Sequence, residues 1–301
     1  MTQADPQAAA ATMKQQGKSF WFASLFLPRQ VADDAARLYT FCRRMDDLAD
    51  IAVTKEKRKE LAEVRQDLQC GASENPAVAD FLRLAEQYDI PREAADCLIG
   101  TFLEDAEAPM IIENEKELIR YCYGVAGTVG LMMSPILAVD RVRARSAAIY
   151  LGVAMQMTNI ARDVLEDAGE GRRYLPGAWL RSLPPPAIIL NRDSQIEIAS
   201  AVDRLLKLAD DYYAIAAAGF PLIPEQSRRG IAIAAAIYRE IGVMLRRKKC
   251  AWWEGRVTVS LPRKLWVATL VLLGQSHLDR MQSNRPAADL WSPLEGLPGV
   301  R

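Results

Sequence analysis

The sequence is poor in histidine and holds no paired cysteine motif. His277 is the only histidine among 301 residues. This excludes most zinc sites and any Ser-His-Asp scheme that needs a histidine near another motif. The five cysteines are an odd number and form no CxxC pair, so we expect reduced thiols in a cytoplasmic protein. The chemistry is therefore left to carboxylates, hydroxyls and basic side chains.

The chain also carries no net charge, because its 38 basic residues (lysine and arginine) balance its 38 acidic residues (aspartate and glutamate). Nucleic-acid binders usually carry a basic excess, so we expect no nucleic-acid partner. The first residues lack the basic and apolar regions of a signal peptide. An uncharged run from Tyr121 to Val139 approaches the roughly 20 residues of a membrane span. Its three glycines and Pro135 favour a buried helix of a soluble protein instead.

Alternating strand patterns are nearly absent, whereas apolar residues at spacings of three and four recur along the chain. Two segments without charge, 121–139 and 146–161, are typical of helices buried on all sides. We find no linker and no internal repeat. The sequence predicts an all-α, single-domain bundle over residues 16–284, with a disordered tail over 1–15 and a loose tail over 285–301. The expected helices cover 30–50, 92–107, 113–133, 146–168, 194–218, 225–249 and 262–281.

The segment around residue 46 places two carboxylates on one helix face. Asp46 and Asp50 are four residues apart, and like charges at that spacing destabilise a helix by about 0.2–0.5 kcal/mol unless a cation binds them. Arg43 lies one turn earlier, where it can reach a phosphate held by the same cation. Asp47 points roughly 100° away, so we expect a structural role for it.

A second polar stripe closes the uncharged segment that begins at Ser146. Asn159, Asp163 and Asp167 follow one another at intervals of four. Such side chains at the end of a buried helix are unfavourable unless something pairs with them. Hard oxygen ligands suit Mg²⁺, which also bridges phosphates. The alternative is a solvated face whose acids pair with neighbouring arginines, but two such stripes favour a diphosphate held between two carboxylate walls by Mg²⁺.

Ionisation of an allylic diphosphate would give a carbocation, which needs an apolar, aromatic-lined pocket with little water. The aromatic cluster Phe20, Trp21 and Phe22 is a candidate lining. By contrast, the acids Glu104, Asp105 and Glu107 read as surface charge, with the rim of a cavity as the alternative.

Four stretches of this sequence resemble the squalene/phytoene synthase family. They are Lys18-Ser19-Phe20 with Leu27-Pro28, the helix from Tyr39 to Asp50, the small-residue segment from Tyr123 to Gly130, and the long signature from Gln156 to Pro176. A weaker match covers residues 238–266. Where the family often shows His-Ser before the lysine, this chain has Gln16-Gly17, so no phosphate contact is expected from those two positions.

The resemblance implies an isoprenoid synthase fold, a helical bundle around a central cavity. It also implies an enzyme that joins two identical prenyl diphosphates through a cyclopropylcarbinyl diphosphate. Carried over by position, the metal ligands for Mg²⁺, or Mn²⁺ in its place, are Asp46, Asp50, Asn159, Asp163 and Asp167. The implied diphosphate contacts are Lys18, Ser19, Tyr39, Arg43, Gln156, Asn159, Arg162, Arg172, Tyr238 and Arg256. The catalytic set is Tyr39, Arg43, Asp46, Asp50, Asp163 and Asp167.

Three alternatives stay open at the level of sequence. The reading we prefer is condensation of two geranylgeranyl diphosphates to phytoene without NADPH. The alternative is condensation of two farnesyl diphosphates to presqualene diphosphate, squalene or dehydrosqualene. A more distant alternative is a non-catalytic assembly factor, which intact acidic motifs disfavour. The basic run Arg246–Lys249, followed by Trp252 and Trp253, reads as a solvated helix end, with peripheral membrane contact as its alternative.

Overall fold

The computed structural model describes residues 6–50, 54–139, 141–190 and 192–300. Within these ranges the protein is built from helices and contains no strand, so the predicted all-α class is confirmed. The α-helices are α1 (Pro6–Gln16), α2 (Lys18–Ser24), α3 (Arg29–Asp50), α4 (Lys55–Cys70), α5 (Pro76–Tyr88), α6 (Arg92–Glu107), α7 (Glu115–Cys122), α8 (Thr128–Ile136), α9 (Arg141–Gly169), α10 (Pro185–Leu190), α11 (Gln195–Ala218), α12 (Glu225–Arg247), α13 (Leu261–Leu272) and α14 (Ala287–Trp291).

Short turns complete the fold. A π-helical turn, η1 (Tyr123–Gly127), joins α7 to α8, so the predicted helix over 113–133 is interrupted. The 3₁₀ turns are η2 (Gly177–Trp179), η3 (Arg192–Ser194), η4 (Phe220–Leu222), η5 (Trp252–Glu254), η6 (His277–Arg280) and η7 (Ser292–Leu294). The predicted helix over 262–281 was too long, because Gly274 adopts a positive φ of 65° just after α13.

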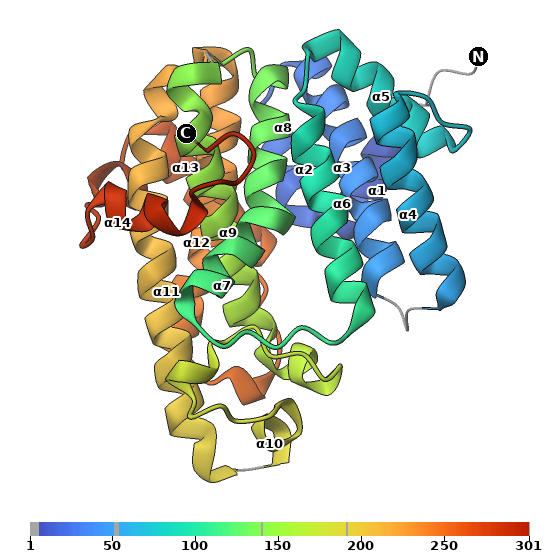
Figure 1. The fold of residues 1–301 in the computed structure, drawn as a ribbon. Helices are drawn as coiled ribbons and strands as arrows, with labels where there is room; N and C mark the ends of the chain where they lie inside the picture. The colour runs from blue at the N-terminus through green and yellow to red at the C-terminus, as the bar shows by residue number, and fades with distance from the viewer. Residues whose placement is uncertain (1–5, 51–53, 140, 191, 301) are drawn as a thin grey trace.

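The long helix α9 lies at the centre and packs against α8, α11 and α12. Figure 1 shows α3, α4, α5 and α6 on one side of it and α11 and α12 on the other, with the green helix α8 in between. Helix α3 packs against α1, α4, α5, α6 and α8. Helix α8 thus packs against both helices that carry the acidic motifs, the peripheral α3 and the central α9.

Two glycines bring η1 and α8 into close contact with α9. A Cβ atom on Gly152 would lie 2.2 Å from the carbonyl oxygen of Ala126, and one on Gly130 would lie 2.2 Å from that of Ala148. Both obstacles are backbone, which cannot rotate away. The small residues of these segments therefore allow close helix packing.

Both predicted tails need correction. Residues 6–15, placed in a disordered tail by the sequence, belong to α1, which buries Met13 against α3. In the segment predicted to be loose, Leu290 and Leu294 are fully buried, and Tyr212 Oη donates to the carbonyl of Leu290 at 2.8 Å. Proline and glycine in that segment obscured its apolar anchors. No helix of the described residues is both long and apolar enough to span a membrane.

Candidate active site

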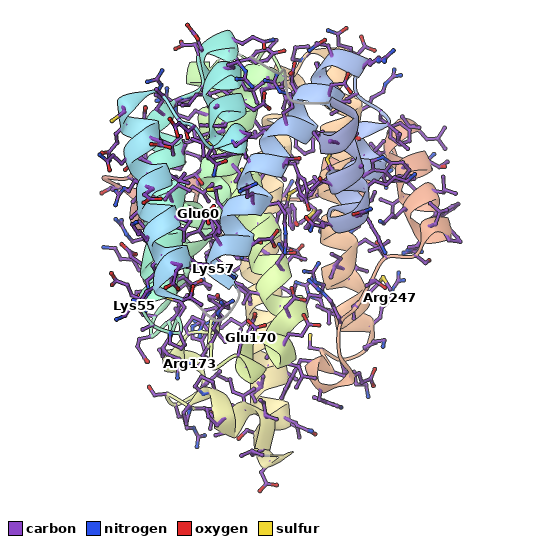
Figure 2. The ribbon with its side chains drawn as sticks, turned by 90° about the vertical axis from the view of Figure 1, so that its right-hand side faces the viewer. Lys55, Lys57, Glu60, Glu170, Arg173 and Arg247 are labelled. Carbon is purple, nitrogen blue, oxygen red and sulfur yellow. The ribbon has the colours of Figure 1, made fainter. Side chains whose placement is uncertain are left out.

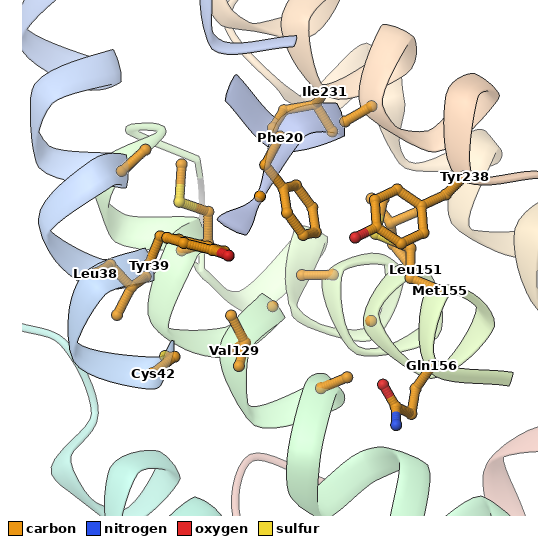
Figure 3. A pocket seen from close by; sticks show the side chains of 18 of the residues that line it. Phe20, Leu38, Tyr39, Cys42, Val129, Leu151, Met155, Gln156, Ile231 and Tyr238 are labelled. Carbon is orange, nitrogen blue, oxygen red and sulfur yellow. The ribbon is translucent and has the colours of Figure 1, made fainter. Parts of the chain in front are cut away.

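A cavity of about 490 Å³ opens between α2, α3, the η1–α8 segment, α9 and α12. Its volume lies in the range of about 300–1,000 Å³ that is usual for small-molecule sites. Figure 3 shows Leu38, Tyr39 and Cys42 on one wall, with Met155 and Gln156 on the other. Most of the lining is apolar, and many of its polar groups come from the two helices that carry the acidic motifs.

On the α3 wall, Tyr39, Arg43 and Asp46 line the cavity one helical turn apart. Arg43 Nη1 lies 3.1 Å from Asp46 Oδ2, and its other terminal nitrogen bonds to Asp47. Burial raises the pKa of Tyr39 to about 12, against the opposing charge of Arg43. Asp47 is thus held by an arginine, in agreement with a structural role. The side chain of Asp50 lies outside the described residues.

On the α9 wall, Gln156, Asn159 and Arg162 line the same cavity. Asn159 donates from Nδ2 to Gln156 Oε1 at 3.3 Å. Its Oδ1 atom is buried and accepts no hydrogen bond from any described residue, and Arg43 Nε across the cavity is likewise buried without an acceptor. Buried polar atoms are normally satisfied. An unused acceptor on one wall and an unused donor on the other suit a cation and an anion between them.

Asp163 is held by two guanidinium groups. Arg162 donates to both carboxylate oxygens, at 2.7 and 2.5 Å, and Arg256 adds a second contact at 3.0 Å. Burial opposes the charge on Arg162, but the bonds to Asp163 outweigh this and raise the arginine's pKa. Asp163 does not line the cavity itself, whereas both of its arginines do. The carboxylate therefore fixes two cations at the cavity wall.

Aromatic rings cover the upper part of the cavity. The ring of Phe20 lies 4.8 Å from that of Tyr238 and 6.0 Å from that of Tyr39 (Figure 3). Phe22 is instead buried in the core, and Trp21 lies under the Lys14 ammonium at 5.2 Å. Of the cluster predicted from sequence, only Phe20 lines the cavity.

The structure brings together eight of the predicted site residues on one cavity surface. They are Tyr39, Arg43, Asp46, Gln156, Asn159, Arg162, Tyr238 and Arg256. Lys18, Ser19, Asp167 and Arg172 are not part of that surface. Lys18 is exposed, and Arg172 pairs with Glu170 at 3.2 Å. Among the described side chains, no three metal-ligating acids gather at one point.

One functional candidate was placed wrongly by sequence. Asp105 is not surface charge but 8% exposed, and it lines the cavity. Its Oδ2 atom accepts hydrogen bonds from Tyr174 at 3.1 Å and from Tyr121 at 3.3 Å, and the two tyrosine rings stack with centroids 4.7 Å apart. Burial first, and the charge of Asp105 after it, raise the pKa of Tyr174. This cluster forms a polar patch in an otherwise apolar wall.

Comparisons with known proteins identify the family of this chain. The family model for squalene/phytoene synthase matches residues 13–263. A 15-cis-phytoene synthase of Enterobacter agglomerans is 36% identical over 93% of this chain and 99% of that protein. A phytoene synthase of Rhodobacter capsulatus is 34% identical, covering 89% of this chain and 80% of that protein.

Solved structures show the same architecture. The crystal structure of a dehydrosqualene synthase in complex with a ligand matches with a TM-score of 0.80 and 30% identity, covering 89% of this chain and 95% of that one. A squalene synthase from Alicyclobacillus acidocaldarius, at 21% identity, matches with a TM-score of 0.70 over 81% of this chain and 94% of that one. The isoprenoid synthase fold expected from sequence is confirmed. The chain belongs to the squalene/phytoene synthase family.

Proposed function

We propose that this protein condenses two geranylgeranyl diphosphates head to head, through a cyclopropylcarbinyl diphosphate, to the forty-carbon hydrocarbon phytoene. The observation that carries the proposal is the cavity, which has a mostly apolar lining, a carboxylate and a guanidinium group on the α3 wall, and two more guanidinium groups, those of Arg162 and Arg256. Each half of the reaction releases one diphosphate and one proton, so no reductant such as NADPH is required. The bacterial relatives that are similar along most of this chain are phytoene synthases by name.

The donor set at the cavity fits Mg²⁺. Aspartate and asparagine oxygens are its preferred protein ligands, and the buried Oδ1 of Asn159 has no other partner among the described residues. The residues that would hold the metal are Asp46, Asp50, Asn159, Asp163 and Asp167. When bound, Mg²⁺ or Mn²⁺ would supply Lewis acidity to the diphosphate leaving group.

The arginines at the α9 wall are already arranged for a diphosphate. Arg162 and Arg256 each contact both oxygens of Asp163, and a phosphate offers the same bidentate acceptor. We propose that the two guanidinium groups exchange the Asp163 carboxylate for the substrate diphosphate as their hydrogen-bond acceptor. This exchange would free Asp163 for the metal. Arg43 and Asn159 would bind from the two walls, since each has one buried polar atom without a partner in the described chain.

The remaining residues act on the prenyl chains. Phe20, Tyr39 and Tyr238 present ring faces to the cavity, where a developing allylic cation gains cation–π stabilisation. The apolar lining excludes water, which would otherwise trap the cation as an alcohol. Asp105 with its two tyrosines offers a proton acceptor for the step that closes the cyclopropane ring.

The test is to incubate the purified protein with Mg²⁺ and either farnesyl or geranylgeranyl diphosphate, and then to extract the hydrocarbon. Forty-carbon product from the longer substrate is the expected result. A thirty-carbon product alone would replace the proposal by the farnesyl alternative, which the similarity to a dehydrosqualene synthase structure favours. If neither substrate gives a product with metal present, the enzyme assignment is refuted. The non-catalytic assembly factor would then be the remaining alternative.

The product of this reaction is insoluble in water. We therefore propose that the enzyme acts in the cytoplasm next to a membrane surface, to which it hands the hydrocarbon. The residues first suggested for this contact need revision, because Trp252 is buried, Arg246 pairs with Asp210 and Lys248 pairs with Glu254.

A further inference from the structure

Helix α13 turns its apolar side chains outward. Five leucine and tryptophan residues on or next to it are among the most exposed apolar side chains of the described protein, namely Leu261, Leu265, Trp266, Leu272 and Leu273. Leu265 and Trp266 are 52% and 54% exposed. On a surface helix of a globular protein, the solvent-facing positions are normally polar. This helix shows the opposite arrangement.

The inward face of the same helix carries charge. Lys264 is buried, and its Nζ atom donates to the carbonyl of Lys18 at 3.1 Å. Arg263 donates to the buried Glu240 of α12 at 2.8 and 2.9 Å. Helix α13 therefore pairs its charges inward and leaves leucine and tryptophan side chains exposed to water. An exposed apolar patch of this kind marks an interaction surface.

This apolar surface also lies close to the active-site cavity. Phe26, Pro224 and Leu272 line a groove at the C-terminal end of α13, together with the polar residues Glu225, Gln226 and Arg229. The chain neighbours of the first two, Leu27 and Ile223, line the apolar part of the active-site cavity. One layer of residues between α2 and α12 therefore separates the cavity from the groove. Next to it, Leu25 is 60% exposed.

Unpaired positive charge lies at the other end of α13. Helices α12 and α13 pack against each other, and Arg247 and Lys249 at the end of α12 form no ion pair within the described chain. Figure 2 shows Arg247 at the edge of the molecule, on the same side as the salmon-coloured helix α13. Lys18, beside Lys264, is exposed as well. The apolar face is thus accompanied by cations, which suits a negatively charged partner.

We propose that the outer face of α13, together with Leu25 and the Phe26–Leu272 groove, docks the protein on an anionic lipid bilayer. An apolar helix face with tryptophan and adjacent lysine and arginine is the pattern of an interfacial helix that lies in the plane of the membrane. The choice of a bilayer over a protein partner rests on the proposed function, since a hydrocarbon leaving between α2 and α12 would enter lipid directly. The docking itself can be measured without any turnover.

The experiment is flotation of the purified full chain with vesicles, in the absence of substrate and metal. We expect binding to vesicles that contain phosphatidylglycerol, and weaker binding to pure phosphatidylcholine. The double variant Leu265→Ser/Trp266→Ser should lower the vesicle partition coefficient by about tenfold or more. The variant Arg247→Gln/Lys249→Gln should lower it by about fivefold per charge on anionic vesicles alone.

A matched control tests whether exposed apolar residues anywhere have this effect. Leu190 and Ile196, on α10 and α11, are 79% and 83% exposed, so Leu190→Ser/Ile196→Ser removes similar apolar surface elsewhere and should leave vesicle binding within twofold. Equal losses in both double variants would overturn the proposal, as would absence of flotation by the unaltered protein.

Two further readouts separate the other outcomes. If Leu265→Ser/Trp266→Ser halves the mass measured by light scattering without lipid, the face joins two copies of the chain and the bilayer is wrong. Turnover in detergent should be unchanged in this variant, whereas stimulation by vesicles should be lost. A protein that floats but makes no hydrocarbon would refute the proposed function and leave the docking surface standing.

Discussion

Replacing Gly152 by alanine tests whether the α9–η1 contact fixes the shape of the cavity. Both Gly152 and Ala126 line it. The added Cβ would lie 2.2 Å from the Ala126 carbonyl oxygen and 2.6 Å from its carbon. Ordinary contacts begin near 3.5 Å, so the two segments would have to separate by about 1 Å.

Two opposing effects set the magnitude. Alanine is favoured over glycine inside a helix by about 1 kcal/mol. Overpacking of a filled interior costs about 1–3 kcal/mol, and the upper end applies here because the obstacle is backbone. We therefore expect Gly152→Ala to lower the free energy of unfolding by about 2 kcal/mol and to reduce hydrocarbon formation, since the cavity wall moves.

The assay is urea unfolding, with the midpoint and slope compared between variants. The matched control is Gly169→Ala at the end of the same helix, where a Cβ would meet nothing within 4 Å. This variant should be as stable as the unaltered protein or slightly more so. If Gly152→Ala proved as stable as Gly169→Ala, the reasoning from close backbone contact would be refuted.

Three further predictions concern single side chains. Asp46→Ala and Asp163→Ala should both abolish hydrocarbon formation, and the latter should also lower stability in urea because it leaves a buried guanidinium unpaired. Asp105→Asn should lower the free energy of unfolding by about 1–3 kcal/mol, since two tyrosine hydroxyls lose a charged acceptor, whereas Glu104→Gln should not. Burial, and then the charge of a neighbouring lysine, lower the pKa of Lys264, so Lys264→Met should raise stability most near neutral pH, and this gain should shrink as pH approaches 10.5.

The sign of the last prediction follows from proton binding. A lowered pKa in the folded state means that the unfolded chain holds the proton more tightly, so the unaltered protein gains stability as pH rises toward the ordinary lysine value. A stability difference between Lys264→Met and the unaltered protein that grows with pH would contradict this. Near-normal turnover in the Asp46 and Asp163 variants would contradict the metal assignment, and equal effects of Asp105→Asn and Glu104→Gln would contradict the buried cluster.

The sequence predicted which side chains of α3 and α9 share a helix face, because that follows directly from helix periodicity. Residues such as Tyr39, Arg43 and Asp46 share one face at spacings of three and four, and the fold turns that face to the cavity. Asp105 was interpreted first as surface charge, with the rim of a cavity only as the alternative, because its charged neighbours resembled a solvated surface. A signal was present, since Leu98, Phe102 and Asp105 continue one apolar stripe of α6 and all line the cavity.

Contacts between distant segments could not be predicted in the same way. The partnership of Asp163 with Arg256 joins α9 to the loop before α13, and no local pattern specifies that meeting. The exposed face of α13 could not be predicted either. Its mixture of leucines and charged residues is compatible with a helix that turns either face inward. Only the packing of Lys264 and Arg263 against α2 and α12 shows which side is outside.

The pairing of Asp163 with two arginines also bears on how the site accepts its substrate. A second wall of carboxylates, facing Asp46 across a low-dielectric cavity, would repel an incoming diphosphate. Asp163 is instead neutralised by Arg162 and Arg256, and it is these two guanidinium groups, not the carboxylate, that line the cavity wall. Under the proposed function, these guanidinium groups would bind the first diphosphate before any metal is bound, and would then leave the carboxylate free for a cation. Binding of the anion first and of the metal second would account for the arginines interleaved with the acidic motif of α9.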